Sequence, residues 1–216
     1  MDRRRTCVAS VLSNSVPAPR SPHSWLRLWA PASCVDAYMT VATDYPDKHV
    51  LENMAHNAAA LKNLPDAPAL ALETTGLAWG NAQHERYVAA NSDALRDGAF
   101  DVVCAADVLW VSSQHAAFLH SVEALLAPAQ SARFVLVAGF HTGRPAITRF
   151  LRSAHAAGLV RDASAPHGGV YERSFQGEIR PWQGASLDEP PDAAPDEDMG
   201  DVGERARWVV VAMLRR

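Results

Sequence analysis

The motif Thr-Asp-Tyr-Pro-Asp at residues 43–47 is the first place where residue types and spacing suggest chemistry. Asp44 follows a short apolar and β-branched run, so it should stand at the carboxyl end of a strand, where a parallel sheet presents ligand-binding residues. A carboxylate there can accept hydrogen bonds from both hydroxyls of a ribose, and Tyr45 adds an aromatic face. Pro46 suits the first turn of a following helix. The alternative for Asp44 is an ordinary N-cap of that helix.

Two later segments add a flat ring and a second carboxylate. Trp79 lies in Gly-Leu-Ala-Trp-Gly at residues 76–80, where the glycines allow close backbone approach and the indole could stack on a purine. The same indole could equally fill the core. Asp107 ends the apolar run that starts at residue 100, so it should face the same strand edge as Asp44. Its alternative role is a helix cap.

These residues need a fold that brings strand ends together, and alternating sequence patterns predict one. The predicted strands are a short run at 41–43 and runs at 69–75, 99–110 and 133–140. The predicted helices have apolar residues at helical spacing and cover residues 48–61, 112–126 and 146–157, the last ended by Gly158. Strands that alternate with helices predict an α/β fold with a parallel sheet.

The C-terminal part predicts an antiparallel hairpin that closes this sheet. Residues 170–179 and 207–214 have strand patterns with no predicted helix between them. The insert at 184–204 is rich in Pro, Asp and Glu, so we expect a disordered acidic loop.

The N-terminal part is rich in Arg, Ser and Pro, and we expect residues 1–31 to be irregular and outside the domain at 32–216. Residues 32–39 predict the tail of a helix that leads into the strand at Val41. A transit peptide is an alternative for the opening segment, although its prolines would interrupt an amphipathic helix.

Composition limits the function classes. The chain has 216 residues, 48% hydrophobic and 20% charged, which suits one globular domain, and we expect a monomer. A net charge of −4 gives no general attraction to nucleic acid or an anionic membrane, and we expect neither partner. The three cysteines form no CxxC pair, so neither a disulfide framework nor a metal site is indicated, and a reducing cytosol is the expected compartment.

In this order the residues resemble the seven-strand S-adenosylmethionine-dependent methyltransferases. The narrower resemblance is to fungal nicotinamide N-methyltransferase-like proteins, a group similar to enzymes that methylate the N-terminus and an adjacent lysine of translation elongation factor 1A. The residues that carry it are the motif at 43–47, Leu51, Asn53, Asn57, the segment at 76–80, Phe-Asp-Val-Val at 100–103, Asp107, His115, His141, Arg144-Pro145 and the strand at 207–211. The implied fold is a Rossmann-like seven-strand sheet with a C-terminal antiparallel hairpin.

The resemblance implies S-adenosyl-L-methionine as cofactor, held by Asp44, Tyr45, Trp79 and Asp107. Asp44 would bind the ribose hydroxyls, Tyr45 would lie beside the adenosine, and Trp79 would flank the adenine. Asp107 would sit beside the methionyl part or the methyl-accepting amine.

The implied catalytic residues are Asp107, His115 and His141. A sulfonium methyl group needs little activation, so catalysis is mainly the alignment of a neutral amine, with a carboxylate easing the developing positive charge. The two histidines are candidates for taking the amine proton or for lining the acceptor entrance. Surface or capping roles are the alternative for each.

The implied function is N-methylation of a protein amine, at a lysine or N-terminus, on a partner such as elongation factor 1A. A small-molecule acceptor such as nicotinamide is the alternative. The sequence departs from the family pattern in one respect, because no glycine occurs before Gly76. We therefore expect the first strand and helix to be lacking or distorted by a truncated or mispredicted N-terminus, which leaves a non-catalytic binding module as a further alternative.

Overall fold

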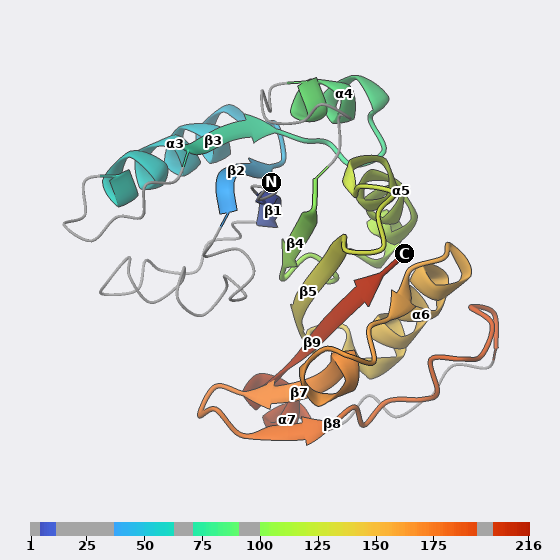
Figure 1. Ribbon diagram of the computed structural model, residues 1–216. Coiled ribbons are helices and arrows are strands. Elements are labelled where there is room, and N and C mark those ends of the chain that lie inside the picture. The colour runs from blue at the N-terminus through green and yellow to red at the C-terminus, as the bar shows by residue number, and fades with distance from the viewer. Residues whose placement is uncertain (1–4, 12–36, 63–70, 91–99, 194–200) are drawn as a thin grey trace.

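The computed structural model describes residues 5–11, 37–62, 71–90, 100–193 and 201–216, and these form one mixed sheet with helices packed on it (Figure 1). The strand order is β3-β2-β1-β4-β5-β9-β7-β8, and β6 pairs with β9. The strands are β1 Arg5–Val11, β2 Ala37–Asp44, β3 Ala71–Gly76, β4 Val102–Ala106, β5 Arg133–Gly139, β6 Val160–Arg161, β7 Val170–Ser174, β8 Ile179–Pro181 and β9 Trp208–Arg215. The helices are α3 Lys48–Lys62, α4 Ala82–Ala90, α5 His115–Leu125, α6 Gly143–Ala156 and α7 Val202–Arg207, with 3₁₀ turns at Ser112–Gln114 and Pro166–Gly169.

The expectation that the first strand is lacking or distorted is wrong. β1 runs parallel to β2 on one side and to β4 on the other, with Val8 opposite both Val41 and Val103. Part of the segment expected to be irregular, residues 1–31, is therefore the central strand, and the strand edges that its loss would expose are paired. The sequence pattern of β1 is weak. Polar residues interrupt its seven positions, arginines come before it, and no glycine follows it before Gly76. The predicted first helix falls within residues 12–36, outside the described residues.

The predicted α/β class is confirmed. The five strands from β3 to β5 in the sheet order are parallel, and three of them match the predicted runs at 69–75, 99–110 and 133–140. β2 is longer than expected, because Ala37–Met39, predicted as the tail of a helix, already pair with β1 and β3. α6 also begins three residues before the predicted start.

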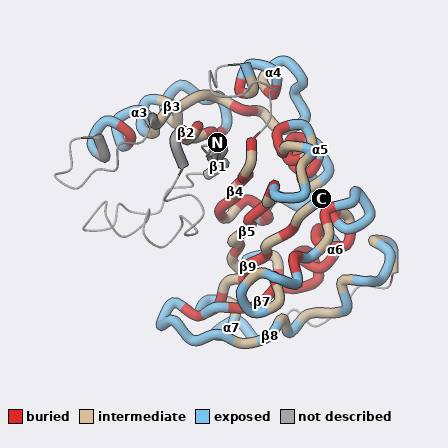
Figure 2. Tube along the Cα trace, viewed as in Figure 1, coloured by how far each residue is buried: buried red, intermediate tan, exposed pale blue. Residues whose placement is uncertain are grey.

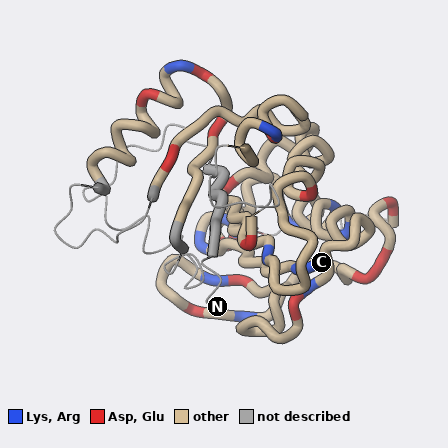
Figure 3. The backbone as a smooth tube through the Cα atoms, turned by 45° about the horizontal axis from the view of Figure 1, so that its top comes forward, with Lys and Arg blue, Asp and Glu red and all other residues tan. Residues whose placement is uncertain are grey.

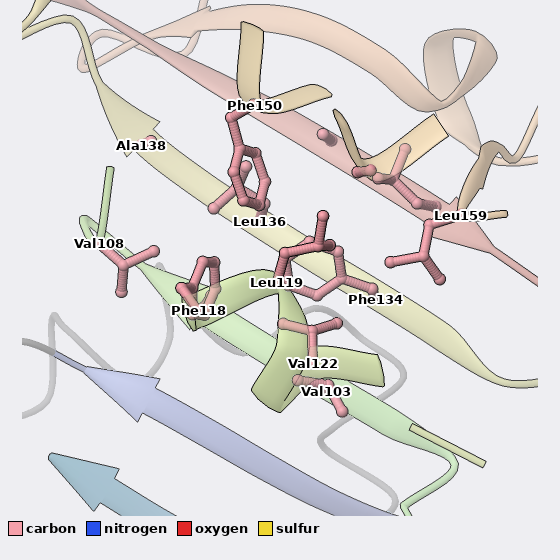
Figure 4. Close-up of a cluster of buried hydrophobic side chains, with 14 of the residues drawn as sticks. Val103, Val108, Phe118, Leu119, Val122, Phe134, Leu136, Ala138, Phe150 and Leu159 are labelled. Carbon is pink, nitrogen blue, oxygen red and sulfur yellow. The ribbon is translucent and has the colours of Figure 1, made fainter. Parts of the chain in front are cut away.

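The helices cover both faces of the sheet, and the face under α5 and α6 holds a core of aromatic rings. The connection through α3 steps from β2 to β3, while the one through α5 steps from β4 to β5 in the opposite direction. Since parallel crossovers are right-handed, α3 and α5 lie on opposite faces. Phe118 of α5 stacks on Phe150 of α6 at 5.6 Å between ring centroids, above the fully buried Phe134 of β5 (Figure 4). Figure 2 shows the buried residues concentrated along β4, β5 and these two helices.

The closing antiparallel hairpin is confirmed, with two corrections. β9 lies between β5 and β7 and is antiparallel to both. The predicted strand at 170–179 is in fact two strands, because the chain reverses at Gly177, whose φ of +94° suits glycine. A helix, α7, does precede β9, and Asp201 caps it by accepting the N–H groups of Gly203 and Glu204.

The expectation of a disordered acidic insert at 184–204 is wrong for its first half. The buried Arg152 of α6 donates to the Ser186 carbonyl at 2.8 Å and pairs with Glu189. Leu187 packs against the core, so residues 184–189 are attached to α6. One acid of this segment, Glu189, therefore has a guanidinium partner 37 positions away, which local sequence spacing could not reveal. Residues 194–200 lie outside the described residues.

The surface carries charges of both signs. Figure 3 shows acidic and basic positions intermixed along the described chain, in keeping with a small net charge of −4 over the whole sequence. Among the described residues, no helix combines the length and apolar character needed to cross a membrane.

The central place of β1 predicts strong protection of its amides. In hydrogen–deuterium exchange, we expect residues 7–10 to exchange as slowly as residues 103–105 of β4, because both strands are paired on both sides. Asp192, an exposed residue in a turn, serves as the fast-exchanging control. Exchange of residues 7–10 at the rate of that control would contradict a central β1.

Candidate functional site

The carboxyl ends of the parallel strands lie in one row at one edge of the sheet. The register pairs Asp44 with Gly76, Val11 with Ala106, and Ala106 with Val137. Asp44 and Asp107 thus flank the end of β1, and two strand spacings separate them by roughly 10 Å. Asp44 ends β2 and Asp107 follows β4 at this edge, and Trp79 comes three residues after the end of β3. That the three converge in one binding crevice stays a prediction.

Asp44 is not a helix cap. Its Oδ1 accepts the Tyr45 N–H at 2.7 Å, and only 5% of the residue is exposed. Asp47 caps α3 instead, because its Oδ1 accepts the N–H groups of His49 at 2.9 Å and Val50 at 3.2 Å. Asp44 therefore remains an almost buried carboxylate at the end of β2, beside the exposed ring of Tyr45.

Trp79 lies just past β3 and packs its ring against the core. Its centroid is 4.8 Å from that of Phe118, with the planes tilted by 51°. The core alternative is therefore correct for part of this half-buried indole. Packing of this kind also fixes the orientation of the ring, which a stacking platform for a purine requires.

The turn that carries Trp79 is held by three side chains that the sequence did not single out. The Ala78 N–H donates to His84 Nδ1 at 3.1 Å, and the Gly80 N–H donates to Ser121 Oγ at 2.8 Å. Ser121 in turn donates to the buried Glu85 at 2.6 Å. Ser121 and Glu85 are 36 positions apart on different helices, so their pairing leaves no local pattern in the sequence.

Asp107 and His141 form a pair at the ends of β4 and β5. His141 Nε2 lies 3.2 Å from Asp107 Oδ1, and the Gly139 N–H donates to the same oxygen at 3.3 Å. Both side chains are accessible, with 43% of Asp107 and 60% of His141 exposed. Gly139 leaves room for the pair, since a Cβ there would come within 2.8 Å of His141 Nε2. The carboxylate therefore faces the next strand end and is not a helix cap.

The backbone of Asp107 is strained. Its φ is +52°, although it is not glycine, and its N–H donates to the Val137 carbonyl at 2.8 Å. Non-glycine residues in this region cost about 1–3 kcal/mol and cluster at functional sites. This conformation aims the carboxylate at the edge of the sheet, where a ligand can reach it.

His115 belongs to the packing layer and has a different environment from His141. Its Nε2 lies 2.9 Å from the Leu109 carbonyl, and its ring meets the edge of Phe150 at 5.4 Å between centroids. A carbonyl only accepts, so Nε2 carries the proton. Burial lowers the pKa of this imidazole, although the Leu109 bond opposes the shift. The structure thus groups His141, but not His115, with Asp107.

A cavity of about 710 Å³ lies away from this edge. Its lining combines apolar and charged residues, among them Leu151, Leu159, Arg161, Trp182, Asp188 and Leu214. Because β9 is antiparallel to β5, Leu214 lies beside the start of β5 at Phe134. None of its lining residues comes from β2, β3 or β4, so the cavity lies apart from the row of Asp44 and Asp107, which is the better candidate site.

Two curated proteins are similar to part of the chain. One is the "Protein N-terminal and lysine N-methyltransferase efm7" of Emericella nidulans, 31% identical over 96 residues, and the other is its namesake in Yarrowia lipolytica, 30% identical over 106 residues. The resemblance to the methyltransferases is confirmed. Each match covers 44% of this chain but only 37% of the relative, and no family model matches.

Among solved structures, the complex of DhpI with SAM and HEP is similar at 13% identity, with a TM-score of 0.40, over 98% of this chain and 79% of that chain. A TM-score of 0.40 carries no argument about this fold. The sheet itself, with its central β1 and its antiparallel β9 between β5 and β7, has the arrangement that the sequence resemblance implies.

The strand-end residues fit the cofactor of a methyltransferase. Asp44 offers a carboxylate at the sheet edge, suited to sugar hydroxyls, and Trp79 offers a ring fixed by Phe118. Asp107 lies across β1 from Asp44 and is open to solvent. The segment that follows β1 lies outside the described residues.

The low pKa of His115 predicts a pH-dependent loss of stability. Its folded pKa lies below the value of about 6.5 for a free histidine, so unfolding takes up protons as the pH falls. The free energy of unfolding should therefore drop from pH 6.5 downwards, until the pH has passed the lowered folded pKa. Urea unfolding at pH 7.5 and 5.5 should show a larger loss for the wild type than for His115→Gln. An equal loss in both proteins would contradict a lowered pKa for this half-buried ring.

Proposed function

We propose that this chain is an S-adenosyl-L-methionine-dependent N-methyltransferase that acts on a protein amine, at a lysine or an N-terminus. The observation that carries the proposal is the placement of Asp44 and Asp107 on either side of the end of β1. One of these two carboxylates can bind the hydroxyls of a sugar while the other binds an amine. Similarity to protein N-terminal and lysine N-methyltransferases supports the choice of a protein acceptor.

The proposed roles follow from exposure and position. Asp44, nearly buried at the end of β2, would accept hydrogen bonds from the ribose hydroxyls. Tyr45 and Trp79 follow β2 and β3, and their rings would flank the adenosine. Asp107, with 43% of its side chain exposed, would face the acceptor amine.

The proposed methyl transfer requires that the amine be aligned with the methyl group and that a base accept one proton from the amine. When bound, S-adenosylmethionine supplies an electrophilic sulfonium methyl group. Asp107 would accept an N–H of the amine, hold its lone pair in line, and attract the positive charge that develops on nitrogen. His141, 3.2 Å from Asp107 Oδ1, would take the proton that the amine loses.

The alternative of a non-catalytic remnant loses the argument from a missing strand, because β1 is in place between β2 and β4. Its other argument, the absence of a glycine before Gly76, is tested by cofactor binding. We propose elongation factor 1A as the partner on the sequence resemblance. The proposed compartment is the cytosol, since the cysteines show no disulfide pattern.

Binding of S-adenosylmethionine tests the first half of the proposal. We expect saturable heat in isothermal titration calorimetry, and a loss of about 1.5–3 kcal/mol in binding free energy on Asp44→Ala, the range for hydrogen bonds to a charged group. Asp188→Ala removes an exposed carboxylate next to the remote cavity and should bind as the wild type does. No saturable heat at millimolar ligand would refute the proposal.

The identity of the acceptor tests the second half. With radiolabelled S-adenosylmethionine, we expect methyl transfer to elongation factor 1A and to a peptide with a free N-terminus and a nearby lysine, and none to nicotinamide. Asp107→Asn should lower kcat by about 10- to 100-fold, because the amide no longer balances the charge on the amine. Labelling of nicotinamide alone would assign the chain to the small-molecule alternative.

A further inference from the structure

A cluster of charges around the buried Glu172 lies beside the turn that carries His141. Arg144 Nε donates to Glu172 Oε1 at 2.8 Å, and its Nη2 donates to Oε2 at 2.9 Å, so the pair is bidentate. Arg180 adds a bond to Glu172 Oε2 at 2.8 Å and reaches Glu204 at 3.2 Å. The four residues come from α6, β7, β8 and α7, and the cluster joins these elements.

The cluster fixes the position of the Arg144 guanidinium more than it adds stability. Glu172 is fully buried, and both of its oxygens are occupied by guanidinium groups. A buried ion pair gains little net stability over apolar packing, since desolvation offsets the attraction between the charges. Its bidentate geometry nevertheless fixes the position and angle of the guanidinium, which a single point charge would not do.

Arg144 is anchored a second time by an aromatic ring. Its guanidinium carbon lies 4.8 Å from the centroid of the Phe140 ring, and Phe140 is itself buried and stacked on Trp182. The Gly143 N–H closes the same turn by donating to the Phe140 carbonyl at 3.0 Å, and Gly143 has a φ of +74°. The chain from 140 to 144 is therefore pinned at both ends.

His141 is the accessible residue inside this pinned turn. It is held on one side by β5, which ends at Gly139, and on the other by Arg144. Its own contact at the site, to Asp107 at 3.2 Å, joins two solvent-accessible groups, and exposed pairs of this kind hold a side chain only weakly. The position of its backbone must come from the turn.

We infer that Arg144 is a positioning residue: its bidentate bond to Glu172 sets the turn that keeps His141 against Asp107 at the methyl-transfer site. This inference rests on the proposed function for the role of His141, but the effect on the position of His141 does not depend on activity. Arg144 itself is buried and paired with Glu172, so it need not contact the acceptor.

Arg180 provides a matched control. It binds the same Glu172 carboxylate and is also stacked, with its guanidinium carbon 3.9 Å from the Trp208 ring. It comes from β8, however, and is not part of the turn that carries His141. Arg144→Lys and Arg180→Lys each keep a charge and lose a fork within the same cluster, so they differ mainly in their connection to His141.

The first test measures the ring of His141 directly by ¹H–¹⁵N NMR, with its signals assigned by their loss in His141→Ala. We expect Arg144→Lys to shift the His141 signals in the direction that Asp107→Asn shifts them, because both break the contact with Asp107. Arg180→Lys should leave them in place, as should either change for the ring of His84, which is bound to Ala78. Unchanged His141 signals in Arg144→Lys would overturn the inference.

Glu172→Asp is a second variant, in case Arg144→Lys does not fold. It keeps the charge but shortens the reach to Arg144, and we expect the same shift of the His141 signals. Thermal unfolding of every variant shows whether the comparison is made on folded protein.

The second test measures methyl transfer. Arg144→Lys should lower kcat by about 10- to 100-fold, as expected for a misplaced group, and leave the KM for S-adenosylmethionine unchanged. In a His141→Ala background the same substitution should cost nothing more, whereas a general loss of structure would cost the same in both backgrounds. If the wild type transfers no methyl group, the proposed function fails, and the NMR result still decides whether Arg144 positions His141.

Discussion

The parallel pairing of β1 with β2 and β4 is the constraint on which the candidate site depends. β1 separates Asp44, the last residue of β2, from Asp107, which follows β4, and the register of both strands is set against β1. A shift of one residue in either ladder would turn the side chains of that strand to the other face of the sheet. The buried aromatic layer under α5 and α6 then holds β4 and β5 in the register that brings Gly139 beside Asp107.

Polar groups in this protein divide into those that can face a ligand and those that hold the first group in place. Asp107 and His141 are exposed and contact each other at 3.2 Å, and solvent screens the attraction between them. Glu172 and Glu85 are buried, and each has its partners at hydrogen-bonding distance. Burial raises the cost of leaving such a carboxylate unpaired, so its partners cannot leave without a large penalty. The buried acids therefore provide rigidity, and the exposed pair is the one that a ligand can reach.

Much of the fold could be predicted from periodicity, and the failures have physical reasons. Apolar runs with β-branched residues, such as residues 100–106 and 133–140, are typical of strands covered on both faces, and they predicted β4 and β5 correctly. β1 was missed because it lies in an arginine-rich segment and its stability comes from two neighbours distant in sequence. The strand-end positions of Asp44 and Asp107 followed from the strands. The partners of Glu85 and Arg144 did not, since contacts 28 to 36 positions apart leave no local periodicity.

The two turns at the site share one design. The turn after β3 that carries Trp79 is held through Ser121 by Glu85, and the turn after β5 that carries His141 is held through Arg144 by Glu172. In each case a buried acid from another element fixes the backbone segment that carries a side chain of the candidate site. The proposed methyl transfer depends mainly on alignment, and the placement of the backbone sets the angle at which a side chain meets its ligand. Residues that never touch the ligand can therefore control the rate as strongly as those that do.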